Sequence, residues 1–412
     1  MSARQLAQRD FLFGRHSHAW VLQNPTWPVE WQQLSPFLGW QDYMASGQVD
    51  LALAFSQIMH NRTKIGFTDS SNGLLNTSGM GRHIVDWMPD GHEEDETVAR
   101  HEFTASSYMS VSNGFAVQGL ALLARMLRVG GRIKEADQFQ HESTHLLTAM
   151  NKLMWNGTAF CDGICSQVQN NSLVMTNMFM LAFGLVPAPY TQQAWDTVAT
   201  WGLEQMGDYG AFWYQVALAG SYYADGDHQQ FLSSDDGTAI LTALTKCDRY
   251  SWCSGLQQDN LTTTRESWHD GTYSHGWGTS PVVGVSLGVM GVKQTSPGFA
   301  TFTVMPKLGT LTHAYIKVPT LRGFITVNAT PASVLVRVPC NTLATLCLPR
   351  SSSSSSPLEY SKDQTSGKLV LLLDGVNNDN WQEVSGHICL SRPVGCGVAG
   401  QPRALQFIVN KI

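Results

Sequence analysis

The sequence has few charged residues and no excess of basic ones. Lysine, arginine, aspartate and glutamate together make up only 14% of its 412 residues, and the formal net charge is −6. Without a basic surplus, nucleic acid is not expected as a partner. Because 43% of the residues are hydrophobic, the low charge does not indicate disorder. We expect a globular protein of one large or two moderate domains.

Long apolar runs are also absent. No stretch of about 18 apolar residues occurs, so we expect neither a transmembrane helix nor a membrane partner. The first twenty residues, MSARQLAQRDFLFGRHSHAW, contain no apolar segment like that of a secretory signal peptide. If the protein is secreted, either its true N-terminus is missing from this sequence or its secretion is non-standard, and we expect the former.

The eight cysteines form no CxxC pair and have no histidine run beside them, which argues against a zinc ribbon or a thioredoxin-like site. We expect no metal and no cofactor. The cysteines fall into four close pairs, for which we predict local disulfides: Cys161/Cys165, Cys247/Cys253, Cys340/Cys347 and Cys389/Cys396. Six N-x-Ser/Thr sequons occur, at Asn61, Asn76, Asn156, Asn170, Asn260 and Asn328. Paired cysteines and sequons predict an extracellular, secreted glycoprotein.

Helical patterning fills the first 296 residues. Apolar residues recur near helical spacing, with glycine or proline stops, over residues 30–46, 50–60, 114–129, 134–155, 169–183, 191–206, 212–224, 228–246 and 281–292. No strand pattern lies between these segments. Helices joined by long loops predict an all-α bundle or toroid.

The pattern changes at Pro297. Short alternating runs such as Val334, Val336 and Val338, separated by glycine, proline and asparagine, predict strands. We therefore expect a helical domain over residues 1–296 and an antiparallel β-sandwich over residues 297–412.

The chemistry is concentrated in the stretch from Thr262 to Pro281, TTTRESWHDGTYSHGWGTSP. A carboxylate between tryptophans suits a sugar-processing site, because the apolar C–H faces of sugar rings stack on indole. The alternative is that Trp268 and Trp277 anchor the core and that Glu266 caps or pairs locally.

This stretch resembles the "TTTxExW … NHxWGxxP" signature of the α-L-rhamnosidases, glycoside hydrolase family 78. The resemblance continues into Pro297-Gly298-Phe299 and Lys317-Val318-Pro319-Thr320, and residues 25–31, 84–87 and 176–179 follow in the family's order. It implies an (α/α)6 barrel, or six-hairpin toroid, with an active site built from loops at one end, followed by a C-terminal antiparallel β-sandwich.

The resemblance also implies a carbohydrate substrate and an inverting hydrolase that releases terminal α-L-rhamnose from glycosides or polysaccharides. Glu266 matches the family's general base, and Glu30 lies where its general acid stands. Further residues are implied as sugar contacts: Asp86, Trp87, Trp268, His275 and Trp277.

The sequence departs from the family pattern at several places. Gln23-Asn24 stand where the family has a sugar-binding aspartate before the first proline. After Trp87 the chain reads Met-Pro-Asp-Gly instead of continuing toward Arg-Asp-Gly, and the family's N-terminal β-domains are not in this sequence. Two alternatives therefore stay open: a related (α/α)6 glycosidase for another sugar, and a non-catalytic carbohydrate-binding homologue. The sequence predicts no particular oligomeric state.

Overall fold

A computed structural model describes residues 29–80, 106–168, 174–220, 223, 237–257, 259–268, 271–331 and 333–349, and the backbone of four further strands between residues 370 and 408. The chain divides into two compact units. The helical unit comprises residues 1–43 and 47–217, and the mixed unit comprises residues 44–46 and 218–412.

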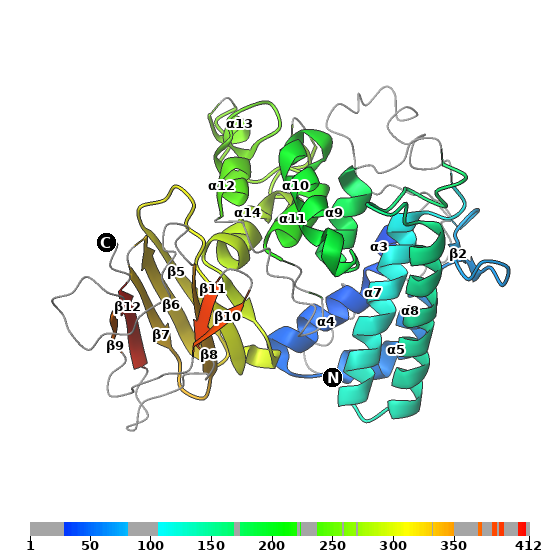
Figure 1. The fold of residues 1–412 in the computed structure, drawn as a ribbon, viewed down its shortest axis with the longest axis horizontal. Helices are drawn as coiled ribbons and strands as arrows, with labels where there is room; N and C mark the ends of the chain where they lie inside the picture. Colours follow the sequence, from blue (N-terminus) through cyan, green and yellow to red (C-terminus); the bar gives the residue numbers. More distant parts are fainter. Residues whose placement is uncertain are drawn as a thin grey trace. The chain divides into compact units, whose positions relative to one another are not determined.

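The helical unit is built around one long buried helix, α7 (Ser110–Val129) (Figure 1). Seventeen of its residues are buried, so it has almost no polar face. The other helices here are α3 (Val29–Gln33), α4 (Ser35–Ser46), α5 (Asp50–Thr63), α8 (Ile133–Leu153), α9 (Val174–Phe183), α10 (Thr191–Trp201) and α11 (Asp208–Leu218), with short 3-10 turns η2 (Ala188–Tyr190) and η3 (Gly202–Gln205). A two-stranded ribbon, β1 (Phe67–Thr68) and β2 (Leu75–Asn76), follows α5.

Aromatic rings from four helices form the centre of this unit. Phe37 of α4, Phe115 of α7, Phe183 of α9 and Trp213 of α11 lie with ring centroids 4.7–5.9 Å apart, mostly edge to face. All four side chains are at most 2% exposed. Such rings contribute large buried areas and favour edge-to-face contacts, so this cluster holds the four helices together.

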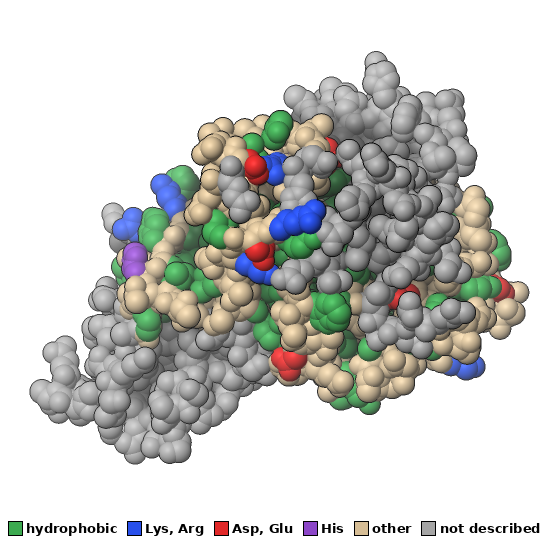
Figure 2. Space-filling view, turned by 90° about the horizontal axis from the view of Figure 1, so that it is seen from above, with side chains coloured by type: hydrophobic (Ala, Val, Ile, Leu, Met, Phe, Trp, Pro, Cys, Tyr) green, Lys and Arg blue, Asp and Glu red, His purple; other side chains and the backbone are tan. Residues whose placement is uncertain are grey.

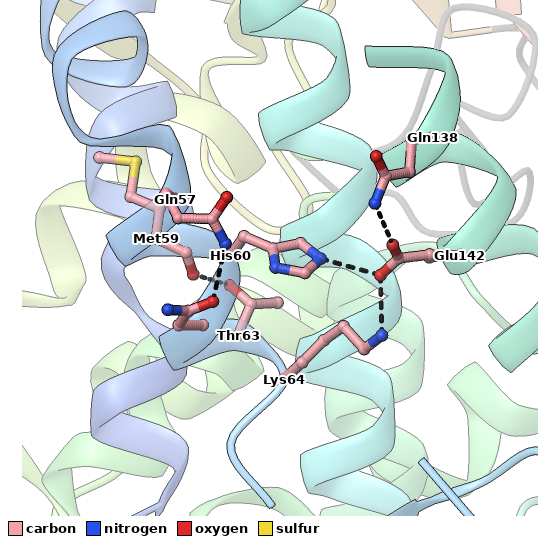
Figure 3. Close-up of polar contacts among 8 residues, drawn as sticks. Gln57, Met59, His60, Thr63, Lys64, Gln138 and Glu142 are labelled. Atoms are coloured by element: carbon pink, nitrogen blue, oxygen red, sulfur yellow. Dashed lines mark hydrogen bonds and ion pairs between the residues drawn. The ribbon is translucent and has the colours of Figure 1, made fainter. Parts of the chain in front are cut away.

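A polar cluster links α5 to α8 (Figure 3). Glu142 of α8 accepts hydrogen bonds from His60 Nε2 and Lys64 Nζ, both at 2.8 Å, and from Gln138 Nε2 at 3.0 Å. The His60 ring stacks on Phe139 with centroids 4.3 Å apart. Although burial alone raises the pKa of Glu142, the hydrogen bonds from Lys64, Gln138 and His60 lower that pKa to about 2.

The mixed unit begins with short helices and ends in two five-stranded sheets. Its helical segments are α12 (Thr238–Thr245), α13 (Trp252–Gln257), η5 (Gly276–Thr279), α14 (Pro281–Val283), the π-turn η6 (Gly284–Val289) and η7 (Pro297–Phe299). One sheet has the order β10-β11-β8-β4-β3, and the other has the order β5-β6-β7-β12-β9. The strands are β3 (Val292–Gln294), β4 (Thr301–Val304), β5 (Ala314–Thr320), β6 (Gly323–Thr330), β7 (Ser333–Val338), β8 (Leu343–Pro349), β9 (Val370–Leu372), β10 (Trp381–Val384), β11 (His387–Leu390) and β12 (Arg403–Ile408).

Both sheets show the alternation that the sequence predicted. In β6 the residues Ile325, Val327 and Ala329 are fully buried while their neighbours are not. The sheets are antiparallel except for one pair, β4 and β8, which run parallel. The chain leaves the first sheet after β4, forms β5 to β7 in the second, and returns as β8, so the returning strand can lie beside β4 in the same direction.

The predicted succession of a helical part and a sheet part is confirmed, and most predicted helices are found within a few residues of their expected bounds. The segment 281–292 differs: helical turns end at Val289, a strand starts at Val292, and Val282 is 69% exposed. The boundary at residues 296 and 297 stays a prediction. No helix in the described residues is long and apolar enough to cross a membrane.

Two predicted disulfides are present, Cys161–Cys165 and Cys247–Cys253. Cys340 and Cys347 are also disulfide-bonded. Cys347 is the register partner of Cys389 across β8 and β11, so the strand register brings the backbone of a second cysteine next to it. The pairing of Cys340 with Cys347 stays a prediction.

Candidate active site

The Glu266 loop is a tight turn in the mixed unit. Arg265 pairs with Tyr273 in an isolated antiparallel bridge, and the Glu266 N–H donates to the Thr272 carbonyl at 3.0 Å. Gly271 closes the turn with φ +86°, and a Cβ there would lie 2.8 Å from the Cβ of Glu266. Only glycine combines this backbone angle with so close an approach to the glutamate.

The Glu266 carboxylate is held by the same turn. Its Oε2 accepts from the Thr272 N–H at 3.0 Å and from the Thr272 hydroxyl at 2.8 Å. The side chain is partly exposed. Two donors on one oxygen fix the carboxylate, which has the chemistry to accept a proton from a water or a sugar hydroxyl.

Arg265 and Trp268 support this loop from inside. Arg265 is only 9% exposed, forms an ion pair with Asp259, and donates through Nη1 to the Trp268 carbonyl at 2.9 Å. The Trp268 side chain is 4% exposed and meets Trp252 edge to face at 5.1 Å. In this structure Trp268 is therefore packed in the interior, as the core-anchor alternative supposed.

His275 and Trp277 lie on the neighbouring turn and are partly exposed. The His275 Nδ1 accepts from the Trp277 N–H at 3.3 Å, and the two rings lie 4.5 Å apart. The Thr264 hydroxyl donates to the His275 carbonyl at 2.6 Å. A Cβ at Gly278 would lie 2.8 Å from the Arg265 carbonyl oxygen, so this turn packs directly on the segment that carries Glu266.

Glu30 lies in the helical unit and is almost fully buried. It is 1% exposed, and the Ser112 hydroxyl of α7 donates to its Oε1 at 3.1 Å. Gln33, one turn further along α3, donates through Nε2 to the carbonyls of Thr63 and Ser112, both at 2.9 Å. These bonds fix the short helix α3 on α5 and α7, and with it the position of Glu30.

The structure thus brings Glu266, His275 and Trp277 together on two adjoining turns of the mixed unit. Glu30 belongs to the other unit, and its pairing with Glu266 stays a prediction. Asp86 and Trp87 lie outside the described residues.

Two polar partners of the candidate carboxyls were not predicted from the sequence. Thr272 and Ser112 hold the two carboxyls, and neither stands in a motif of its own. The glycine before Thr272 was the available signal, because it marks a turn that returns toward Glu266. Within the described part of the chain, no group of three or more His, Cys, Asp or Glu side chains could hold a metal ion.

Two protein-family models match the chain. Residues 18–280 match the model of the bacterial α-L-rhamnosidase six-hairpin glycosidase domain, and residues 291–361 match the C-terminal domain of the same proteins. The chain belongs to this family. The predicted fold, a six-hairpin glycosidase domain with a C-terminal sheet domain, is thereby confirmed.

Solved rhamnosidases have the same fold at low sequence identity. The α-L-rhamnosidase from Dictyoglumus thermophilum matches with a TM-score of 0.65 and 15% identity over 92% of this chain and 39% of its own. The enzyme from Aspergillus terreus matches with a TM-score of 0.56 and 18% identity over 76% of this chain and 36% of its own. The Streptomyces avermitilis α-L-rhamnosidase, complexed with L-rhamnose, matches with a TM-score of 0.54 and 16% identity over 92% of this chain and 32% of its own.

This chain therefore spans only 32–39% of the length of these three structures. No curated protein sequence matches it.

Proposed function

We propose that this chain is an inverting glycoside hydrolase that releases terminal α-L-rhamnose from glycosides or polysaccharides, with Glu266 as its general base. The observation that carries the proposal is the Glu266 carboxylate, fixed by two donors of Thr272 on a partly exposed turn beside His275 and Trp277. Family membership supports the choice of sugar, as does the L-rhamnose complex of the Streptomyces avermitilis enzyme.

Glu30 is the proposed general acid. A buried carboxyl is more easily kept protonated than an exposed one, and the acid must carry a proton to deliver to the leaving oxygen. The two carboxyls differ in burial, since Glu266 is partly exposed and Glu30 is 1% exposed, and this difference supports the proposed roles of base and acid. Inversion further requires a separation of roughly 6.5–9.5 Å between the two carboxyls, which admits the attacking water.

The proposed sugar contacts follow from exposure. His275 offers a ring nitrogen to sugar hydroxyls, and Trp277 offers part of an indole face. Asp86 and Trp87 keep the roles that the family resemblance implies. Trp268 would act indirectly, because its buried ring keeps the Glu266 loop in place. Secretion and glycosylation are proposed on the paired cysteines and the sequons.

Glu266→Gln tests the base. The amide keeps the shape and removes the basicity, so kcat on an aryl α-L-rhamnoside should fall by roughly 10²–10⁴, while L-rhamnose binding measured by calorimetry persists. Asp196→Asn is the control: it removes an exposed carboxylate of α10, which accepts from Gln192, and leaves the Glu266 loop unchanged. A Gln variant with parental turnover would overturn the assignment. Proton NMR of the first product should show β-L-rhamnose, and the α anomer would overturn inversion.

Glu30→Gln tests the acid. A poor leaving group needs a proton, whereas a nitrophenolate departs without one. The variant should therefore lose activity on natural rhamnosides and largely keep activity on a dinitrophenyl rhamnoside. Equal losses on both substrates would assign Glu30 a structural role. If the parent binds L-rhamnose without hydrolysing either substrate, the chain is a binding homologue; if it turns over a fucoside or glucoside instead, it is a glycosidase for another sugar.

A further inference from the structure

The sheet that starts with β5 exposes a face carrying aromatic and cationic side chains. Alternate residues of β6 and β7 are buried, and the residues between them reach the opposite face. We call the exposed side of β5, β6 and β7 the outer face. Its side chains are Tyr315, Lys317, Phe324, Thr326, Asn328, Leu335 and Arg337. Tyr315 is 57% exposed and Phe324 is 53% exposed, which is unusual for rings of this size.

Acidic residues are missing from this region. No aspartate or glutamate occurs between residues 271 and 358, although the whole chain carries a net charge of −6. Lys317 and Arg337 lie on the outer face, and Arg322 lies at the turn between β5 and β6. At the left of Figure 2, where the strands of Figure 1 lie, blue and purple side chains gather beside green ones, and no red is visible among them.

The cations of this region have no carboxylate partner in the described part of the chain. Lys317 Nζ lies 3.9 Å from the ring centroid of Phe324, a cation–π contact between neighbouring strands. The Arg322 guanidinium donates only to carbonyl oxygens, those of Gly298 at 3.1 Å and Asn341 at 3.0 Å. Their positive charges are therefore available to an anionic ligand.

The spacing of the two rings fits an extended ligand. The strand register places Phe324 opposite Pro319, which is four residues from Tyr315 along β5. At about 3.4 Å per residue, the two positions are roughly 13 Å apart along the strands and one strand apart across them. Several linked sugar rings cover such a span, and each aromatic ring could stack on one of them. Asn328, the register partner of Tyr315, is hydrogen-bonded to His313 at 2.7 Å and adds a polar group beside that ring.

We propose that the outer face binds polysaccharides that carry carboxylate groups, that is, chains containing uronic-acid residues. The aromatic rings would stack on the sugar faces, while Lys317 and Arg337 would pair with the carboxylates. A charged polymer suits this face better than a neutral one because the face has cations and no acids. The surface is separate from the Glu266 loop, so it can bind whether or not the chain is an enzyme.

Affinity electrophoresis with polygalacturonate as the probe tests the proposal, with each substitution made in the parent protein. This polymer contains no rhamnose, so the proposed turnover cannot interfere. Removing both rings, with Tyr315→Ala and Phe324→Ala, should weaken binding at least about tenfold. Phe67→Ala is the matched control, because Phe67 of β1 is 54% exposed and should leave binding unchanged. Replacing Lys317 and Arg337 by glutamine should weaken binding to polygalacturonate but not to its fully methyl-esterified form. Added salt should likewise weaken binding to the charged polymer and leave binding to the methyl ester unchanged.

Three results would overturn the proposal. The first is parental affinity in the double aromatic variant. The second is preference for the methyl ester over the free acid. The third is that the outer-face substitutions leave polygalacturonate binding unchanged but abolish binding to phosphatidylserine vesicles or self-association of the chain. All variants should retain parental activity on a small aryl rhamnoside, so a failure here is distinguishable from a failure of the catalytic proposal.

Discussion

Glu142→Gln should destabilise the helical unit, because this carboxylate is the common acceptor of the link between α5 and α8 (Figure 3). His60 and Lys64 both donate to its Oε2 at 2.8 Å, and Gln138 donates to Oε1. Glutamine keeps the size and one acceptor oxygen but removes the negative charge. The substitution therefore converts charge-assisted hydrogen bonds into weaker neutral ones.

The size of the effect follows from the pKa of Glu142, which is lowered from 4.5 to about 2. At about 1.4 kcal/mol per tenfold change in acidity, this difference sets an upper limit of about 3 kcal/mol at pH 7. The side chains of Glu142 and Lys64 are 21% and 28% exposed, so solvent screens the interaction. We therefore expect a loss of about 1–2 kcal/mol in unfolding free energy.

The pH dependence has a defined sign. A carboxyl whose pKa is lower in the folded state contributes its full stability above the unfolded value of 4.5 and loses it as the pH falls toward about 2. The difference between the parent and the Gln variant should thus be constant from pH 7 to pH 5 and shrink to about three fifths at pH 3.5.

Urea unfolding at pH 7, 5 and 3.5, with hydrogen exchange of the α5 and α8 amides, measures this. Asp137→Asn is the matched control on the same helix. Asp137 also pairs with a cation, Arg128 at 2.6 Å, but the two side chains are 63% and 45% exposed. The control should change stability by less than about 0.5 kcal/mol. Equal stability of parent and Gln variant at pH 7, or a difference that does not shrink on acidification, would refute the reasoning.

Three further predictions follow from the described residues. Gly271→Ala should reduce kcat on an aryl rhamnoside by about tenfold or more, because its Cβ would lie 3.2 Å from Glu266 Oε2. Gly131→Ala is the control: with a similar φ of +79° and open space around it, this substitution should lower stability and leave activity unchanged. In thermal unfolding, the stability of the parent relative to Lys293→Met should rise between pH 7 and 10.5, because burial and the charge of Lys307 lower the pKa of Lys293 to about 7. At every pH the variant also loses the hydrogen bond from Lys293 Nζ to the Gly220 carbonyl at 2.6 Å. Peptide mapping of protein from a secreting eukaryotic host should find no glycan at Asn76, which is 9% exposed, and should find glycans at the exposed sequons, namely Asn61, Asn156 and Asn260.

Much of the fold could be predicted from the sequence because local signals and packing agree there. The α7 helix contains the apolar-rich segment 114–129 with Gly130 as its stop, and β7 alternates buried and exposed residues. One predicted helix, 30–46, is two in the structure. Pro36 lies in the first turn of α4, where its missing N–H does no harm, and the chain accordingly breaks at Leu34.

The turn η6 shows where periodicity fails. Its residues read as a helix, but they form a π-turn because they must pass very close to α12. A Cβ at Gly288 would lie 2.1 Å from Ile240 Cδ1, so the glycine marks a close approach between segments that are far apart in sequence. Periodicity reports which residues are apolar, but it does not report how near a distant segment will come.

In the candidate site, too, local composition predicts some features, and tertiary packing determines the others. Trp268 and Trp277 are similar as sequence signals, since both stand in the same aromatic, polar stretch as Glu266, two and eleven residues after it. The structure separates them: Trp268 meets Trp252 in the interior, and Trp277 stays partly exposed beside His275. The difference arises because the partner of Trp268 comes from α13, and pairing of that kind depends on tertiary contacts that no local pattern encodes.

The two tryptophans should therefore differ in their effects when replaced. Trp277→Ala should mainly weaken sugar binding, whereas Trp268→Ala should mainly lower stability, by roughly 3–5 kcal/mol for a buried indole. Thermal unfolding and L-rhamnose titration of the two variants would distinguish the roles, and the same pattern of losses in both would show that the burial difference has no functional meaning.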